Sequence, residues 1–252
     1  MTMPTDLGYC DLHCHLLYGL DDGAKTLEDS LEMARALVDL GFTTVAPSPH
    51  NRAEYADAAT ARARMAEVQA ALDAAGVKLA LELNAENFFM DEALLVNVGT
   101  ERARLLGAGG YILVEAPYTS PVPALLEIIF RLALKGITAL IAHPERCLEF
   151  ERKGRAAEAV RAGARLQLDI GALTGRYGPG PKKLSRQFLA DGLYSVGATD
   201  LHSPHSAREW VGKSLAELQS RAGAAAVTAM MATNPRQILV GGPLEMPSEG
   251  RV

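Results

Sequence analysis

The chain has 252 residues and a formal net charge of −5, and 48% of its residues are apolar while 22% are charged. This length and composition suit one large α/β domain with a sizeable core and exclude global disorder. No block of basic residues with interleaved aromatic residues occurs, so we expect no nucleic-acid partner. The N-terminus has no secretory signal pattern, and no apolar stretch is as long as a membrane span. These features predict a soluble, cytoplasmic protein without membrane insertion.

Short apolar runs alternate with amphipathic stretches along the chain. The first unit combines a strand at Tyr9–His13 with a helix that follows an N-cap at Thr26 and ends at Gly41. Six further strands are predicted at 43–47, 77–83, 111–115, 137–142, 165–170 and 194–199, and five further helices at 58–75, 91–98, 123–135, 155–162 and 182–191. Such alternation predicts a parallel sheet, closed or nearly so. The Gly- and Pro-rich tail at 241–252 is expected to be flexible.

Five of the six histidines and four carboxylates lie where these apolar runs end. The set comprises His13, His15, Asp22, His50, Glu86, Glu115, His143, Asp200 and His202. Among these, Asp22 lies on the loop after the first strand, at the same face. In parallel α/β sheets, functional residues lie at the carboxyl ends of strands, so we expect these side chains to meet. Imidazoles and carboxylates brought together in this way predict a hydrolytic site with several metal ions.

The spacing of His13 and His15 adds to this prediction. Residues i and i+2 of a strand point to the same face, so both imidazoles can reach one ion. Alone, the pair could equally be two exposed polar residues, and Glu86 or Glu115 alone could be a solvated loop residue. Each of them, however, ends an apolar run where an unpaired charge would be costly to bury.

Three arginines near this set are candidates for binding phosphate. Arg146 is the first, because a guanidinium group binds phosphate oxygens in a bidentate manner. The alternative for Arg146 is an ion pair with Glu145 or Glu149. Arg52 and Arg208 are secondary candidates, with solvation at the surface as their alternative.

The cysteines exclude several other kinds of site. An odd, sparse count without a CxxC pair argues against a disulfide framework and a sulfur-rich zinc site. A cysteine phosphatase needs an arginine six positions after its cysteine to bind phosphate. After Cys10, Cys14 and Cys147 this position holds Leu16, Leu20 and Lys153, so that pattern is absent.

Several motifs together resemble the polymerase-and-histidinol-phosphatase (PHP) superfamily. They are similar above all to bacterial metal-dependent protein-tyrosine phosphatases of capsule and exopolysaccharide gene clusters. The motifs are Asp11-Leu-His-Cys-His15, Leu20-Asp-Asp-Gly23, Ser30-Leu-Glu-Met-Ala-Arg35, Pro49-His50, Glu86, Tyr111-Ile-Leu-Val-Glu115, Ile141-Ala-His-Pro-Glu-Arg146, Ala198-Thr-Asp-Leu-His202 and Asn234-Pro-Arg-Gln-Ile-Leu239. The resemblance runs from residue 9 to residue 239, which is nearly the whole chain.

This resemblance implies an α/β fold, a distorted (β/α)7 TIM-like barrel, formed by a single domain at 1–240. It implies that the nine residues above bind three divalent ions, often manganese, although iron, zinc or cobalt would accept the same ligands. It also gives Arg146 a catalytic, phosphate-binding role. The second arginine of the family falls at Ala207, one residue before Arg208, and whether Arg208 replaces it depends on the loop. The region Gly171–Pro181 does not align clearly with the family.

The implied substrate is the phosphorylated, tyrosine-rich tail of a bacterial tyrosine kinase of polysaccharide export. In the expected mechanism, a hydroxide that bridges two metal ions attacks phosphorus, while a third ion and Arg146 take up charge on the phosphoryl oxygens. Four carboxylate ligands, three divalent ions and one hydroxide leave a charge of about +1, which attracts a phosphate dianion. Self-association is also possible, since Ser30–Arg35 matches a helix start that relatives use for it.

Four alternatives remain open at this stage. A small-molecule phosphatase such as histidinol phosphatase would use the same ligands. A metal-binding module without catalytic activity would keep them as well. An amidohydrolase also opens with H-x-H but uses a lysine at a mid-barrel strand end, where this chain has glutamates. A nuclease-like module is disfavoured by the acidic composition.

Overall fold

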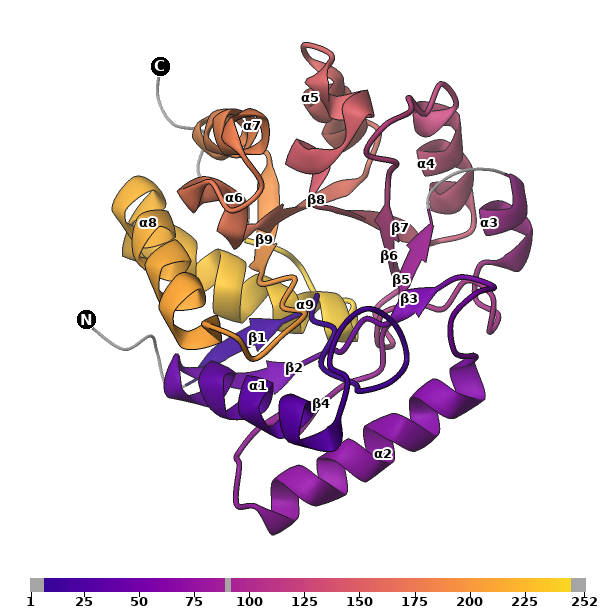
Figure 1. Cartoon of the computed structure of the whole chain (residues 1–252). Coiled ribbons are helices and arrows are strands. Elements are labelled where there is room, and N and C mark those ends of the chain that lie inside the picture. Colours follow the sequence, from indigo (N-terminus) through magenta and orange to yellow (C-terminus); the bar gives the residue numbers. More distant parts are fainter. Residues whose placement is uncertain (1–6, 89–91, 246–252) are drawn as a thin grey trace.

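Parallel strands lie at the centre of the molecule, and helices surround them (Figure 1). The computed structural model describes residues 7–88 and 92–245. Within these residues the strands form a sheet of three, in the order β1-β2-β4, and a sheet of six, in the order β3-β5-β6-β7-β8-β9. Every pair of neighbouring strands is parallel. The predicted α/β class with a parallel arrangement is therefore confirmed, but the strands are divided between two sheets.

Each of the seven predicted strands overlaps an observed strand. The observed strands are β1 (Tyr9–Asp11), β2 (Phe42–Val45), β3 (His50–Asn51), β4 (Ala80–Leu81), β5 (Glu86–Phe88), β6 (Tyr111–Glu115), β7 (Thr138–Ala142), β8 (Arg165–Asp169) and β9 (Tyr194–Ala198). The short strands β3 and β5 were not predicted. The predicted strand at 43–47 ends at Val45, because Pro47 and Pro49 have no N–H to donate to a neighbouring strand. The chain then resumes as β3 in the second sheet.

Hydrogen bonds link the segments at the two junctions between the sheets. The side-chain amide of Asn84, between β4 and β5, donates to the carbonyl of Leu12 at 2.8 Å. At the other junction, the backbone of Asp200 donates to His13 at 2.8 Å, and that of His15 donates to Leu201 at 2.9 Å. The segments that follow β1 and β9 therefore lie side by side, at the end of the strands where the predicted ligands are found.

The helices largely follow the predicted ranges. They are α1 (Leu27–Asp39), α2 (Ala58–Ala74), α3 (Glu92–Asn97), α4 (Leu125–Leu134), α5 (Arg155–Arg161), α6 (Ile170–Thr174), α7 (Pro179–Ala190), α8 (Ala207–Thr228) and α9 (Asn234–Val240). Thr26 caps α1 as predicted, and it forms a reciprocal capping box with Asp29. Helices α6, α8 and α9 were not predicted, and Asp91 lies outside the described residues.

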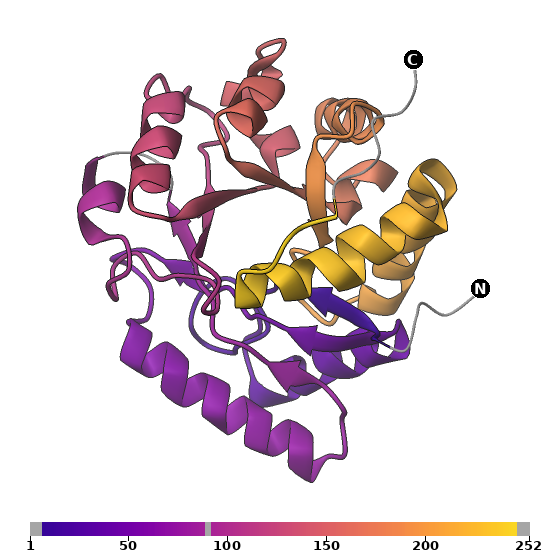
Figure 2. The same cartoon turned by 180° about the vertical axis from the view of Figure 1, so that it is seen from behind.

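The core has two parts. A small cluster of buried residues includes Leu12, Leu113, Leu140 and Val196, and Ile238 of α9 joins it. The C-terminal helices cross in front of the strands when the molecule is seen from behind (Figure 2). The larger part of the core fills the space between strands and helices. Apolar side chains fill this interior closely, and the polar residues of the predicted site lie where the strands end.

The C-terminal segment and the membrane prediction can be compared with the structure in part. Most of the predicted flexible tail lies outside the described residues, but two hydrogen bonds to Asn234 hold Glu245 within it. None of the helices in the described parts of the chain is long and apolar enough to cross a membrane.

Candidate metal centre

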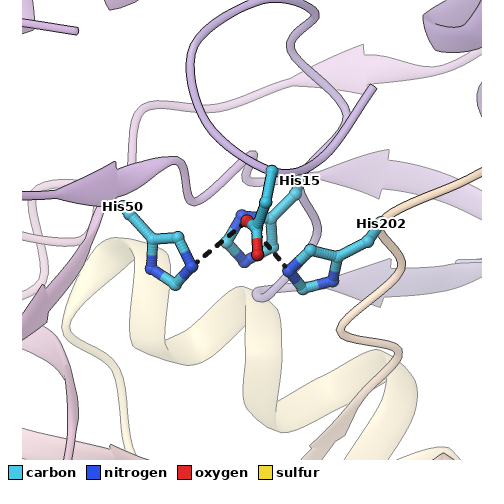
Figure 3. A group of neighbouring side chains, drawn as sticks. His15, His50 and His202 are labelled. Atoms are coloured by element: carbon cyan, nitrogen blue, oxygen red, sulfur yellow. Dashed lines mark ion pairs between the residues drawn. The ribbon is translucent and has the colours of Figure 1, made fainter. Parts of the chain in front are cut away.

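All nine predicted ligands come together in one place. Their ligand atoms form four overlapping groups, and within each group these atoms lie within 4.8 Å of one another. The groups are His15, Asp22, His50 and His202; His13, His15 and Asp200; His13, Glu86 and His143; and His50, Glu86 and Glu115. Figure 3 shows His15, His50 and His202 pointing toward one another, with ion pairs from His50 and His202 to a carboxylate of the same group.

The two N-terminal histidines converge for a different reason than the predicted one. Strand β1 ends at Asp11, so His13 and His15 lie in the irregular segment that follows it and not on a strand. Their Nε2 atoms are nevertheless only 3.3 Å apart. Backbone hydrogen bonds to the segment after β9 hold this part of the chain in place.

Glu86 lies at the centre of the cluster. Its carboxylate oxygens are 3.3 Å from Nε2 of His13, 2.9 Å from Nδ1 of His50 and 3.0 Å from Nε2 of His143. Burial raises the pKa of Glu86, but the charges and hydrogen bonds of the surrounding histidines outweigh burial and hold this pKa well below its usual range. Glu86 starts β5, so its position depends on a strand that was not predicted.

His15 and His50 show the complementary shifts, whereas burial holds the pKa of His143 below its usual value. Burial lowers the pKa of His15, but hydrogen bonds to Asp21 and Glu86 raise it well above its usual value. Burial likewise lowers the pKa of His50, and its hydrogen bonds to Asp22 and Glu86 raise it to about 9. A divalent ion that binds here would therefore have to displace protons from His15 and His50, and its own charge would then stabilise the carboxylates.

Asp21 orients two of the ligands and was not singled out from the sequence. Its Oδ2 atom lies 2.7 Å from Nδ1 of His15 and accepts a hydrogen bond from the backbone of His50 at 3.0 Å. The loop can adopt this shape because residue 23 is glycine. A Cβ atom on Gly23 would lie 2.3 Å from the carbonyl oxygen of His15. The Asp-Asp-Gly motif thus supplies both a supporting residue, Asp21, and a candidate ligand, Asp22.

Strand β8, which supplies no predicted ligand, supports the cluster through Gln167. The side-chain amide of this buried residue lies 3.0 Å from Nδ1 of His13. Asp11 accepts a hydrogen bond from the backbone of His13 at 3.1 Å and binds Thr199 through its other oxygen. Gln167 thus holds the ring of His13 and leaves Nε2 free to reach a metal ion, whereas Asp11 holds the backbone of His13 in place.

The donor set fits divalent metal ions. It mixes imidazole nitrogens with carboxylate oxygens, has no thiolate, and is largely buried. Because the four groups share His13, His15, His50 and Glu86, they fit a compact centre of more than one ion. The described cluster is therefore a candidate metal centre.

Arg146 reaches this centre from a short 3₁₀ helix at Pro144–Arg146. One of its guanidinium nitrogens lies 3.2 Å from Asp169 and 2.5 Å from Asp200. The alternative pair with Glu145 or Glu149 is not observed. Glu149 pairs with Arg155 instead, and Glu145 accepts hydrogen bonds from the hydroxyl of Tyr194 and the backbone of Asp169. Asp169, which the sequence suggested to be structural, therefore also positions Arg146.

The two secondary arginines lie in different environments. Arg52 pairs with Glu115 and reaches the edge of the metal centre. Arg208, by contrast, is exposed, and its Nε atom donates to Asp39 of α1 at 2.7 Å. Arg208 is absent from the lining of the cavity over the metal centre, so the structure does not bring it together with Arg146.

A cavity of about 210 Å³ opens over the metal centre. Its walls combine seven candidate ligands and both nearby arginines with two tyrosines that were not predicted. The lining residues are Asp22, His50, Glu86, Glu115, His143, Asp200, His202, Arg52, Arg146, Tyr55 and Tyr118. An arginine beside a cationic centre suits an anionic ligand.

Comparison with known proteins places this site in a family. Residues 9–240 match the family described as capsular polysaccharide synthesis, CpsB/CapC. The chain belongs to this family. The match covers all nine candidate ligands and Arg146, and it agrees with the resemblance predicted from the sequence motifs.

Individual relatives carry the same family names. The chain is 31% identical to the tyrosine-protein phosphatase YwqE of Bacillus subtilis over 201 residues. This alignment covers 77% of each of the two chains. It is 24% identical over 241 residues to the tyrosine-protein phosphatase CpsB of Streptococcus pneumoniae, which covers 91% of this chain and 98% of CpsB.

Solved structures agree with the fold of this family member. A structure from a study of YwqE and CpsB, described there as unique metal-dependent tyrosine phosphatases, superposes with a TM-score of 0.83 at 26% identity and covers 96% of this chain and 100% of the other. The phosphotriesterase homology protein of Escherichia coli, solved with phosphate in its active site, has a TM-score of 0.53 at 14% identity, covering 93% of this chain and 99% of the other. This second likeness concerns the fold alone.

Proposed function

We propose that this protein is a metal-dependent phosphatase that hydrolyses phosphotyrosine in proteins. The observation that carries the proposal is the buried, overlapping set of histidines and carboxylates with Arg146 beside it. Relatives named as tyrosine-protein phosphatases support the choice of substrate.

The nine residues of the cluster are the proposed metal ligands. Four carboxylates gathered in one largely buried place favour several divalent ions, and we propose three, with manganese as the first candidate. Glu86 contributes to two of the four groups, so its carboxylate could contact more than one ion. Asp21 and Gln167 would hold the rings of His15 and His13 in place.

The chain's own residues would prepare phosphate-ester hydrolysis as follows. When bound, the ions would activate water for attack on phosphorus and offset negative charge. Arg146 would bind the phosphoryl oxygens, and the ion pairs with Asp169 and Asp200 hold its guanidinium at the cavity. Arg52, which reaches the same cavity, is a second proposed phosphate-binding residue. A tyrosinate leaving group has a pKa of about 10 and needs only modest help to depart.

We also propose how the strands close into a barrel, which substrate the protein acts on, where it is located and how it self-associates. The distorted (β/α)7 barrel would arise if β3 continues the strand position of β2 and β5 continues that of β4, giving seven positions in one domain at 1–240. The phosphorylated tail of a capsule-cluster tyrosine kinase is the proposed substrate, and the cytoplasm is the proposed location. A homo-oligomer formed through α1 is also proposed, on the motif at Ser30–Arg35.

The test compares a phosphotyrosine peptide with histidinol phosphate as substrates of the manganese-loaded protein and its Arg146→Ala variant. The proposal predicts a higher kcat/KM on the peptide and a large loss in the variant. Preference for histidinol phosphate would favour a small-molecule phosphatase, and no turnover of either would favour a binding module without catalytic activity.

A further inference from the structure

Two tyrosines line the cavity over the metal centre without belonging to the ligand set. Tyr55 lies in the turn after β3, and its ring is stacked on His50, with ring centres 5.4 Å apart and planes at 22°. Tyr118 lies in the loop after β6, and its ring centre is 5.6 Å from that of His143. The two rings therefore contact histidines of different ligand groups.

Packing alone does not account for Tyr118. Tyr118 is 45% exposed although it lines a polar site. Among the residues that the structure describes, no hydrogen bond is found to its hydroxyl or to that of Tyr55. The feature that both residues offer to a ligand is thus an aromatic face at the cavity.

The size of the cavity indicates which part of a substrate these rings would meet. At about 210 Å³ it is smaller than the roughly 300–1,000 Å³ of pockets that enclose drug-sized ligands. A phosphoryl group would occupy the polar part between the candidate ligands and Arg146. The group esterified to it would then extend outward, past Tyr55 and Tyr118.

We propose that Tyr55 and Tyr118 form an aromatic subsite that stacks on the ring of an aryl phosphate and makes the site selective for aryl over alkyl phosphate monoesters. This inference rests on the proposed function, because it requires a phosphate ester at the metal centre. Tyr118 is the stronger determinant, since it is the more openly exposed ring and also approaches Arg146.

A different role for Tyr118 must be distinguished from this one. The guanidinium carbon of Arg146 lies 4.9 Å from the ring centre of Tyr118 and 4.1 Å from that of Tyr177. If Tyr118 only positioned Arg146, removal of the Tyr118 ring would weaken the binding of every phosphate ester equally. Tyr177 provides the matched control, because it contacts the same guanidinium but is not among the residues that line the cavity.

The first arm of the test measures binding to the manganese-loaded full chain by calorimetry, with benzylphosphonate as the aryl probe and ethylphosphonate as the alkyl probe. We expect Tyr118→Leu and Tyr55→Leu each to lower the affinity for benzylphosphonate by about 2- to 10-fold. The affinity for ethylphosphonate should change by less than about twofold. Tyr118→Phe keeps the ring and should bind both probes like the unaltered protein. Tyr177→Leu should lower the affinity for both probes by the same factor.

The second arm measures kcat/KM on peptides of one sequence with phosphotyrosine or phosphoserine. Tyr118→Leu should raise KM for the phosphotyrosine peptide selectively. Equal losses on aryl and alkyl ligands, or no loss on the aryl ligand, would overturn the aromatic subsite. If the unaltered protein hydrolyses neither peptide, the proposed function fails, and the binding arm still decides whether the subsite exists.

Discussion

Oδ2 of Asp21 lies 2.7 Å from Nδ1 of His15, so a residue outside the ligand set fixes the ring of a candidate ligand at the centre of the cluster. The same carboxylate oxygen accepts a hydrogen bond from the backbone of His50. Asp21 therefore couples the loop after β1 to the start of β3, and its role can be tested without removing a ligand.

We predict that Asp21→Asn lowers the affinity for manganese by about 10- to 100-fold, because the neutral amide no longer stabilises the orientation and charge of His15. Titration of the metal-free protein with manganese measures this effect. Asp39→Asn is the matched control, since Asp39 is exposed on α1 and pairs only with a surface arginine. Equal affinities for the two variants would contradict the role of Asp21.

Two of the three arginines named from the sequence, Arg146 and Arg208, should behave differently. Arg146→Ala should lower kcat/KM on a phosphotyrosine peptide by about 10²- to 10³-fold, the usual cost of losing one fixed donor to a developing charge. Arg208→Ala should change it by less than about twofold, because Arg208 pairs with Asp39 outside the cavity. Comparable losses in both variants would mean that Arg208 reaches the substrate during turnover.

Metal affinity should rise with pH. In the metal-free protein the pKa of His50 is about 9, above its usual value of about 6.5, so this imidazole holds a proton that a metal ion must displace. Below pH 9 each displaced proton should increase the apparent affinity by about tenfold per pH unit, and above pH 9 the dependence on this group should level off. Calorimetry in buffers with different heats of ionisation counts the protons released. Binding without proton release at pH 7 would contradict this prediction.

The buried pair of Glu149 and Arg155 should contribute to stability and not to metal binding. Both residues are about 5% exposed, and Glu149 also accepts a hydrogen bond from the backbone of Val122. We expect Arg155→Ala to lower the free energy of unfolding by about 3–5 kcal/mol, because it leaves a buried carboxylate without its partner. Urea unfolding measures this loss. Arg131→Ala, which breaks an exposed pair with Glu92, should cost less than about 1 kcal/mol.

The ligand set could be predicted from the sequence because charged residues that end apolar runs stand out. His143 and Asp200 follow strands whose patterns are long enough to be recognised. By contrast, β3 has two residues and β5 has three, and so short a run carries no periodicity. Glu86 was therefore assigned to the cluster correctly, but the strand that begins with it was missed.

The supporting residues could not be predicted because they depend on contacts between distant segments. Asp169 meets Arg146 across 23 positions in the chain, and Gln167 meets His13 across 154. Nothing in the local pattern distinguishes Asp21 from Asp22, whose roles are set by the loop around Gly23. Tyr118 likewise has an ordinary loop sequence, and only the folded chain shows that it lines the cavity.

The most direct test of the central claim measures metal content and hydrolysis of a phosphotyrosine peptide on the same sample, before chelation, after exhaustive chelation and after manganese is restored. We predict about three ions per chain, loss of turnover with the chelator, a lower free energy of unfolding without metal, and recovery of turnover when manganese returns. Unchanged turnover in a sample shown to be free of metal would contradict a metal-dependent phosphatase.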